Sequence, residues 1–223
     1  MKKTSLWEEH AQRYVYSVIA PKINLIKDFP GHNVIVDLGC GDGIYIPFLA
    51  KKAHFIVAID ISHLRLKRAQ GQITLIGIKN SVDFVLCDAR HLPLKANSVG
   101  LVFASDVLEH FSNEDFKIIL SEIERISYNL VATIPNPHTP LFKEDPTHIL
   151  SYTIIQLILH LSRRCTYSYH VRGFYLPLLR EKVKNRIFKE FTRKILQIFP
   201  WLSTYLVITG TKYTRSQKIA CRT

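Results

Sequence analysis

Short apolar runs separated by amphipathic stretches dominate the first two thirds of the chain. The first run, Val34–Leu38, is rich in β-branched residues and follows the turn-forming segment Pro30–Asn33, a pattern typical of a buried parallel strand. The same pattern predicts further strands at Phe55–Ile59, Val82–Leu86, Val99–Ala104 and Leu130–Ile134. Helical patterns separate most of these runs. The alternation predicts a parallel sheet with helices on both of its faces.

The helices on either side of this core are less regular. In Asn113–Ile126, apolar residues recur at steps of three or four behind an asparagine N-cap, which predicts an amphipathic helix. Thr4 or Ser5 followed by Glu8 forms a capping-box pattern and predicts a helix through about Ile19 that Pro21 ends. After Ser151 the pattern changes, and it predicts these elements: a helix, a strand over Cys165–Val171, a basic helix over Leu178–Phe199 and a last strand over Tyr205–Thr209.

Composition limits the class of protein. The chain has 223 residues, of which 47% are hydrophobic and 22% charged, enough to build one folded domain with a full core. No apolar run approaches the roughly 20 residues that span a bilayer, and Glu8 and Glu9 fall where a signal peptide would need an apolar segment. The four cysteines are far apart without a CxxC pair, which argues against a disulfide scaffold or a zinc ribbon. We therefore expect a single domain over residues 1–223 in the cytoplasm.

Charge is distributed unevenly along the chain. The formal net charge is +12; residues 1–150 hold 16 basic and 16 acidic residues, whereas residues 151–223 hold 14 basic and 2 acidic ones. The whole excess thus belongs to the last third, which suggests that one face of the protein meets an anionic partner.

A glycine-rich loop follows the first predicted strand. Asp37-Leu38-Gly39-Cys40-Gly41-Asp42-Gly43 lies between this strand and a helix, where the carboxyl ends of the strands of a doubly wound sheet bind nucleotide-like ligands. Asp60 ends the second strand, a position that suits a carboxylate bound to ribose hydroxyls or, alternatively, an N-cap near Ser62. Asp88 follows the third strand, where it would accept an adenine amino group or close a turn.

These segments resemble, in order, the motifs of the class I S-adenosylmethionine-dependent methyltransferases. Val34–Gly43 is similar to the first motif, Ala58–Ser62 to the acidic second motif and Cys87–Ala89 to the third, while Asn97–His110 ends in the Val-Leu-Glu-His that many members share. The resemblance covers residues 34–136. It implies a Rossmann-like, doubly wound sheet of seven strands, mainly parallel with an antiparallel last strand. It also divides the chain into a helical lid (1–30), a cofactor-binding core (31–136) and an acceptor side (137–223).

The resemblance also assigns nine cofactor-binding positions. The positions expected at the methionine part of S-adenosylmethionine are Asp37, Gly39, Cys40, Gly41 and Ser105. The positions expected at the ribose and adenine are Asp60, Ile61, Asp88 and Ala89. Gly100 departs from the family pattern, because an aspartate usually begins the fourth strand. That aspartate is mostly structural, so we expect the cofactor assignment to hold.

The sequence assigns no catalytic base. Candidates near the pocket are Asp106, His110, His138 and His148, each of which is equally compatible with capping or packing. No Asn/Asp-Pro-Pro-aromatic motif follows the fourth strand, which disfavours methylation of amino groups such as adenine N6. We expect no metal site, because Glu109/His110 and Asp145/His148 lack a third ligand at a recognisable spacing.

The acceptor depends on the last third of the chain. The basic helix 178–199 has three interpretations: a core-packed helix with a solvated basic face, a helix at an anionic membrane surface, or an RNA contact with nearby tyrosines. The function we predict is methyl transfer to a small-molecule or lipid acceptor. For the cytoplasmic protein, peripheral association with a membrane stays open as an alternative. The alternatives are an RNA methyltransferase, a non-catalytic binding protein, or an NAD-dependent dehydrogenase, which would need a glycine where Ile44 stands.

Overall fold

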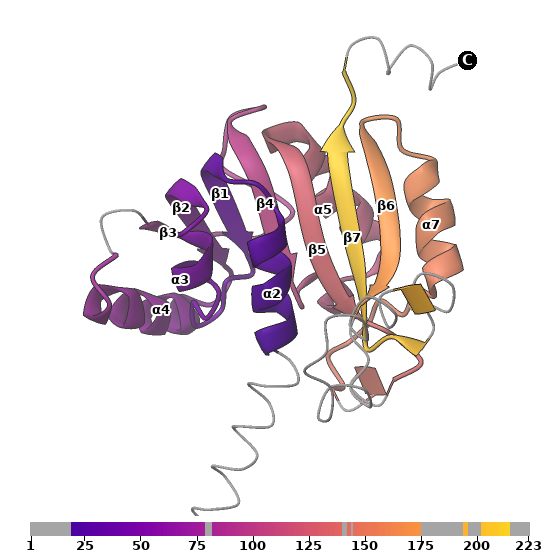
Figure 1. Cartoon of the computed structure of the whole chain (residues 1–223), viewed down its shortest axis with the longest axis horizontal. Helices are drawn as coiled ribbons and strands as arrows, with labels where there is room; N and C mark the ends of the chain where they lie inside the picture. Colours follow the sequence, from indigo (N-terminus) through magenta and orange to yellow (C-terminus); the bar gives the residue numbers. More distant parts are fainter. Residues whose placement is uncertain are drawn as a thin grey trace, which may run out of the picture.

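The predicted strands assemble into one seven-stranded sheet in the computed structural model (Figure 1). The structure describes residues 19–78, 82–139, 142–143, 145–174, 194–195 and 202–214. The strands are β1 (His32–Leu38), β2 (Ala53–Asp60), β3 (Val82–Leu86), β4 (Val99–Ser105), β5 (Ser127–Pro135), β6 (Tyr167–Phe174) and β7 (Tyr205–Lys212). Their order is β3-β2-β1-β4-β5-β7-β6.

Strand direction confirms the expected topology. The pairs β1–β2, β1–β4, β2–β3 and β4–β5 are parallel, whereas β7 runs antiparallel to both of its neighbours, β5 and β6. The order reverses between β1 and β4, because β2 and β3 extend the sheet in one direction and β4 and β5 in the other. At such a switch point the two helices that leave β1 and β4 pass to opposite faces and leave a crevice.

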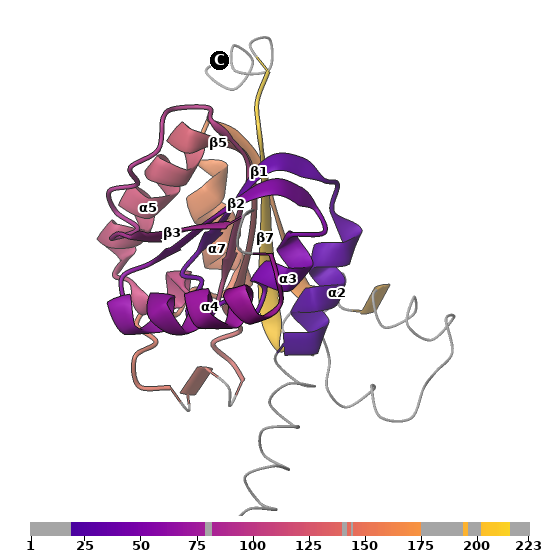
Figure 2. The same ribbon diagram turned by 90° about the vertical axis from the view of Figure 1, so that its left-hand side faces the viewer.

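Helices cover both faces of the sheet. They are α2 (Ala20–Asp28), α3 (Ile46–Leu49), α4 (His63–Leu75), α5 (Asn113–Ile126) and α7 (Ile154–Ser162), with a short 3₁₀ helix η3 (Leu108–His110). Buried side chains of α2, α3 and α4 share one core cluster, and those of α5 and α7 share the other. In Figure 2 the sheet is seen with α5 on one side and α2 and α3 on the other. None of the described helices is long and apolar enough to cross a membrane.

Two local expectations were wrong. Pro21 does not end a helix; it lies in the first turn of α2, where its missing N–H costs no hydrogen bond. The N-cap of α5 is Ser112 rather than Asn113, because the Ser112 hydroxyl accepts a hydrogen bond from the backbone N–H of Asp115 at 3.1 Å. The first predicted helix before Ile19 and nearly all of the predicted basic helix 178–199 lie outside the described residues.

Candidate active site

The glycine loop after β1 has a backbone that only glycine adopts readily. Gly39, Gly41 and Gly43 have φ values of +68°, +54° and +81°. The backbone N–H groups of Gly39 and Cys40 both donate to the carbonyl of Ile59, at 2.8 and 3.0 Å, which ties the loop to the end of β2. A Cβ atom at Gly39 would lie 2.5 Å from Cγ2 of Val107. The loop therefore holds its backbone close to the segment that follows β4.

A cavity of about 580 Å³ opens beside this loop. Its wall includes the loop, the residues after β4 and the segment 145–148, so it joins the expected cofactor side to the expected acceptor side. The lining residues are Ile19, Gly39, Cys40, Gly41, Asp42, Ile44, Tyr45, Arg65, Ser105, Asp106, Glu109, His110, Pro135, Asp145, Pro146, Thr147, His148 and Tyr205. A cavity of this size suits a cofactor together with part of an acceptor.

A second cavity, of about 300 Å³, lies on the other side of Gly39. Its wall contains three of the positions expected at the ribose and adenine, namely Asp60, Ile61 and Ala89. The methionine-side positions Gly39, Cys40, Gly41 and Ser105 line the larger cavity instead. The fold thus places these predicted residues in the walls of two cavities that share Gly39, whereas Asp37 does not line either of the two.

Asp60 supports the loop directly. Its Oδ2 accepts a hydrogen bond from the backbone N–H of Gly41 at 2.8 Å, and its Oδ1 accepts one from the backbone N–H of Ser62, also at 2.8 Å. Ser62, rather than Asp60, caps α4. Because each carboxylate oxygen accepts about two hydrogen bonds, both oxygens of Asp60 retain acceptor capacity for ligand hydroxyls.

Asp37 is the most deeply buried carboxylate at the loop. It is 1% exposed, and its Oδ2 has no hydrogen-bond partner among the described residues. Burial, together with the nearby negative charge of Asp60, raises the pKa of Asp37 to about 7. A buried acceptor without a donor is costly, so this position favours a ligand that brings a donor or a positive charge.

Replacing Asp37 with asparagine should therefore change how stability depends on pH. Between about pH 4 and pH 7 the folded protein keeps a proton on Asp37 that the unfolded chain has released, so the free energy of unfolding falls as pH rises through this window. Asp37→Asn removes this loss. The free energy of unfolding of the variant minus that of the unmodified protein should therefore be larger at pH 8 than at pH 4, by up to about 4 kcal/mol. Thermal melts of both proteins across this range test it; a stability difference that is equal at pH 4 and pH 8 would contradict it.

Asp88 lies beside the site but does not line either of these cavities. Its carboxylate receives a bidentate interaction from Arg90, with Nη2–Oδ2 at 2.7 Å and Nε–Oδ1 at 3.0 Å. The Arg90 hydrogen bonds hold the pKa of Asp88 below its usual range. The neighbours Cys87 and Ala89 do line the smaller cavity. Contact between Asp88 and an adenine thus stays a prediction.

The end of β4 is anchored by residues from three elements. The Ser105 hydroxyl lies 3.0 Å from the hydroxyl of Thr133 on β5, and the Lys22 ammonium on α2 pairs with the Asp106 carboxylate. Lys22 is fully buried, and its Nζ lies 4.1 Å from the centre of the Tyr205 ring. Asp106 itself has a φ of +53°, which is rare outside glycine. No sequence pattern singles out Lys22, because a lysine in the first turn of a helix is ordinary.

Arg65 also lies at the site unexpectedly. It lines both cavities, and its guanidinium is so close to the glycine loop that a Cβ at Gly41 would lie 2.6 Å from Nη2. Its Nε is 3.7 Å from Oδ1 of Asp42. Arg65 is exposed near the start of α4. The sequence alone does not distinguish it from an arginine that only contacts solvent.

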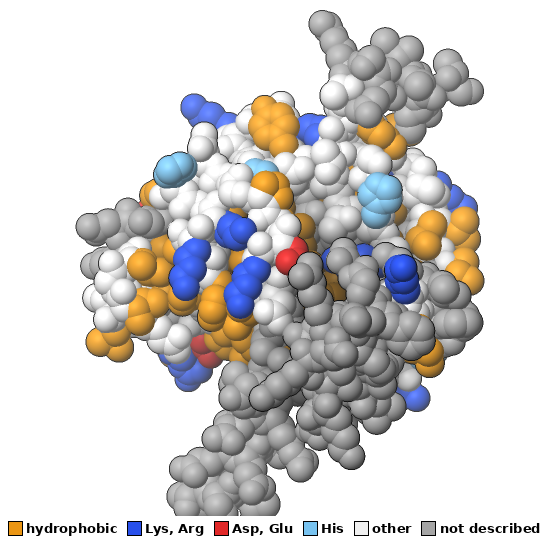
Figure 3. Space-filling view, viewed as in Figure 1, with side chains coloured by type: hydrophobic (Ala, Val, Ile, Leu, Met, Phe, Trp, Pro, Cys, Tyr) orange, Lys and Arg blue, Asp and Glu red, His pale blue; other side chains and the backbone are white. Residues whose placement is uncertain are grey.

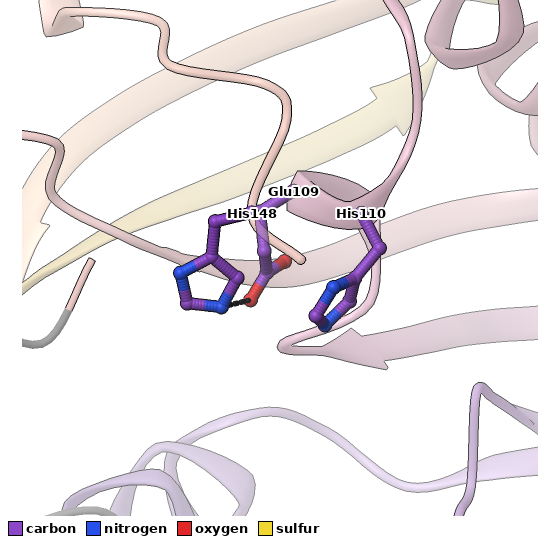
Figure 4. Close-up of side chains that lie close together, drawn as sticks. All are labelled: Glu109, His110 and His148. Carbon is purple, nitrogen blue, oxygen red and sulfur yellow. Dashed lines mark ion pairs between the residues drawn. The ribbon is translucent and has the colours of Figure 1, made fainter. Parts of the chain in front are cut away.

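Three residues that were considered as catalytic bases or metal ligands form a cluster at the acceptor end of the larger cavity. Glu109, His110 and His148 point toward one another from η3 and from the segment before α7 (Figure 4), and one potential ligand atom from each lies within 4.8 Å of the others. Glu109 is fully buried, and neither of its carboxylate oxygens has a hydrogen-bond partner among the described residues. Burial and the charge of Asp106 raise the pKa of Glu109 well above its usual range. His138, by contrast, is exposed and does not line either of these cavities.

The residues present fit S-adenosylmethionine. The loop approaches the larger cavity with its backbone rather than with side chains, Asp37 leaves a buried acceptor unsatisfied, and Asp60 keeps acceptor capacity beside the smaller cavity. These groups match the positive charge and the hydroxyls of such a cofactor. Asp37, Gly39, Cys40, Gly41 and Ser105 would hold the methionine part, and Asp60, Ile61 and Ala89 the nucleoside.

Comparison with known proteins agrees with this geometry. A family model described as "Methyltransferase domain" matches residues 36–128. A malonyl-[acyl-carrier protein] O-methyltransferase from Hamiltonella defensa is 26% identical over 93 residues, which are 42% of this chain and 33% of that protein. Methyltransferase GfsG from Streptomyces halstedii is 31% identical over 97 residues, 43% of this chain and 34% of that protein. The chain thus spans about a third of the length of these relatives.

Solved structures share the whole fold. A SAM-dependent methyltransferase from Archaeoglobus fulgidus superposes with a TM-score of 0.65 at 21% identity, covering 95% of this chain and all of that one. One from Aquifex aeolicus gives a TM-score of 0.63 at 16% identity, covering 96% and 100%. These likenesses extend the shared architecture beyond residues 36–128. Residues 36–128 thus match a methyltransferase domain, and the chain as a whole shares the fold of these solved methyltransferases.

Proposed function

We propose that the protein transfers a methyl group from S-adenosylmethionine to a small-molecule or lipid acceptor. The observation that carries this proposal is the larger cavity, because a single space reaches from the glycine loop to the Glu109–His148 cluster. S-adenosylmethionine supplies a methyl group already activated on a sulfonium centre, so the protein's main task is to hold an acceptor in line with it. A continuous cavity allows this alignment.

The charge of the cavity wall favours a small acceptor over a polyanion. Four carboxylate residues line it, namely Asp42, Asp106, Glu109 and Asp145, against one arginine, Arg65. A phosphate backbone would be repelled by this wall. One of the relatives described above supports the same choice, since its name specifies a malonyl group on an acyl-carrier protein.

A lipid acceptor is supported by the outer surface of α7. Ile155, Ile158 and Leu159 are 68%, 45% and 54% exposed, and Ile149 just before the helix is 64% exposed. Figure 3 shows exposed hydrophobic side chains gathered over α7 on this face. Apolar side chains grouped at the surface mark sites that meet other apolar matter. The acceptor side of the protein thus carries an apolar surface close to the cavity segment 145–148.

The hypotheses about the basic helix 178–199 stay predictions, because nearly all of this segment lies outside the described residues. The same holds for the RNA alternative and for the peripheral membrane location. The non-catalytic and dehydrogenase alternatives lose their support, because the matched domain is a methyltransferase domain.

Transfer of labelled methyl groups tests the proposal. The purified chain is incubated with methyl-labelled S-adenosylmethionine and cell extract, and lipid, RNA, protein and small-metabolite fractions are then counted. We expect label in the small-metabolite or lipid fraction. The matched control is the Gly39→Val protein, which should transfer none. Label confined to RNA or protein would overturn the acceptor class, and failure of the protein to bind S-adenosylhomocysteine in calorimetry would overturn the activity.

A further inference from the structure

The Glu109–His148 cluster has the composition of a cation site. We propose that Glu109, His110 and His148 bind a divalent transition-metal cation at the acceptor end of the larger cavity. The three residues come from two segments 38 positions apart in the chain, and their potential ligand atoms lie within 4.8 Å of one another. Two imidazoles with one carboxylate form a ligand set that proteins use for zinc and for iron. The expectation of no metal site rested on the lack of a third ligand, which the fold supplies.

The protonation of both histidines favours this assignment. Nδ1 of His148 lies 2.9 Å from the carbonyl oxygen of Phe142, and Nδ1 of His110 lies 3.2 Å from the carbonyl oxygen of Thr147. A carbonyl oxygen only accepts, so Nδ1 of His148 carries the proton of its bond. Nδ1 of His110 also lies 2.9 Å from the Thr147 hydroxyl, which donates its own proton to Oδ1 of Asp145 and therefore accepts from the ring. Nε2 of each ring is then free to offer a lone pair. Backbone carbonyls commonly orient metal-binding histidines in this way.

The buried carboxylate supplies an independent reason. Glu109 is fully buried, yet neither carboxylate oxygen has a hydrogen-bond partner among the described residues. Its Oε1 lies 4.0 Å from Nε2 of His148, too far for a hydrogen bond. Two ligands of a tetrahedral zinc ion at about 2.0–2.1 Å lie about 3.4 Å apart, so a bound ion would draw this pair together by roughly half an ångström.

Charge around the cluster points the same way. Asp145 places its Oδ2 3.7 Å from Nε2 of His148, and the Asp106 charge acts on Glu109. Lys22 is the cation paired with Asp106. The charges that act on Glu109 are thus two carboxylates and one ammonium group, an environment that favours a bound cation.

The proposed cation site also restricts the chemical class of the methyl acceptor, an inference that rests on the proposed function. A cation held by three protein ligands keeps open positions that face the cavity, and it lowers the pKa of a hydroxyl that coordinates there. The hydroxyl proton leaves to solvent, the oxygen forms a bond to the methyl carbon, and the carbon–sulfur bond breaks with its electron pair staying on sulfur. The acceptor expected from this arrangement is therefore a hydroxyl-bearing molecule, which becomes a methyl ether.

Cation binding is tested on the full chain after treatment with a chelator. Calorimetric titration with Zn²⁺ or Mn²⁺ should show one cation bound per chain, and the cation should raise the melting temperature. Glu109→Gln and His148→Ala should each weaken binding at least tenfold. The matched control is His54→Ala, because His54 is an exposed histidine at the start of β2, at the opposite end of this strand from Asp60 and the glycine loop. It should bind like the unmodified protein.

Two further readouts keep the inference falsifiable. If Glu109→Gln does not fold, His110→Ala replaces it in the test, because a half-buried side chain is less important for folding. The absorption spectrum of the Co²⁺-loaded protein should also change when an imidazole ligand is removed. The inference is overturned if the unmodified protein binds none of these cations, or if the folded variants bind them with unchanged affinity. S-adenosylhomocysteine binding is measured in parallel and should survive in Glu109→Gln and His148→Ala, since neither residue lines the smaller cavity. Its absence in the unmodified protein would overturn the proposed function and leave the cation site standing.

Discussion

Replacing Gly39 with valine is expected to abolish the binding of S-adenosylhomocysteine. A Cβ atom at this position would lie 2.5 Å from Cγ2 and 2.7 Å from Cβ of Val107, and the φ of +68° is strained for any β-branched residue. The loop must then move away from Val107, and the movement changes the wall shared by both cavities. Calorimetry should detect no binding, and methyl transfer should be lost with it.

The control for this substitution is Gly71→Val. A Cβ at Gly71 would meet nothing within 4 Å, so the same chemical change on α4 should leave ligand affinity intact. Circular dichroism separates loss of the site from loss of the fold, and Gly39→Ala offers a smaller perturbation if the valine protein does not fold. Unchanged affinity in folded Gly39→Val would refute the placement of the cofactor at this loop.

Replacing Asp60 with alanine is expected to lower the affinity for S-adenosylhomocysteine by tenfold or more. Hydrogen bonds to a charged acceptor contribute about 1.5–3 kcal/mol each, so loss of two ribose contacts exceeds this factor. The melting temperature should fall as well, because the backbone N–H groups of Gly41 and Ser62 lose their acceptor. Asp83→Ala on β3 removes an exposed carboxylate and serves as the control.

Asp60 has two expected roles, to support the glycine loop and to bind the ribose hydroxyls. A ligand without these hydroxyls separates the two roles. The unmodified protein should bind the deoxy analogue of S-adenosylhomocysteine more weakly than the natural ligand. Asp60→Ala should bind both ligands equally, because the discriminating carboxylate is gone. If Asp60→Ala still prefers the natural ligand by the original factor, Asp60 only supports the loop and does not contact the ribose.

Much of the fold could be predicted because its strands are buried on both faces. Val34–Leu38 and Phe55–Ile59 consist almost wholly of apolar residues, and the last four residues of each are buried in the sheet. Val82–Leu86 was predicted with its observed bounds, whereas other strands extend by one to three residues beyond the apolar run. Strand ends are set by hydrogen bonds to neighbours, which composition does not show.

The site was predictable where the backbone required particular residues. Gly39, Gly41 and Gly43 have positive φ values, and such positions leave glycines in the sequence. Lys22 and Arg65 were missed because their role depends on where α2 and α4 pack, and a local pattern carries no such information. The approach of His148 to Glu109 likewise depends on how the chain returns to the sheet after β5.

The placement of β7 has a consequence for how the chain is made. Tyr205–Lys212 is among the last parts of the sequence, yet it pairs with β5 on one side and β6 on the other. During synthesis, β5 and β6 therefore cannot pair with β7 until residues up to Lys212 have left the ribosome. In the meantime both strands keep unpaired backbone edges that other strands can bind. Chains truncated before residue 205 should accumulate as aggregates even though the matched methyltransferase domain is complete in them.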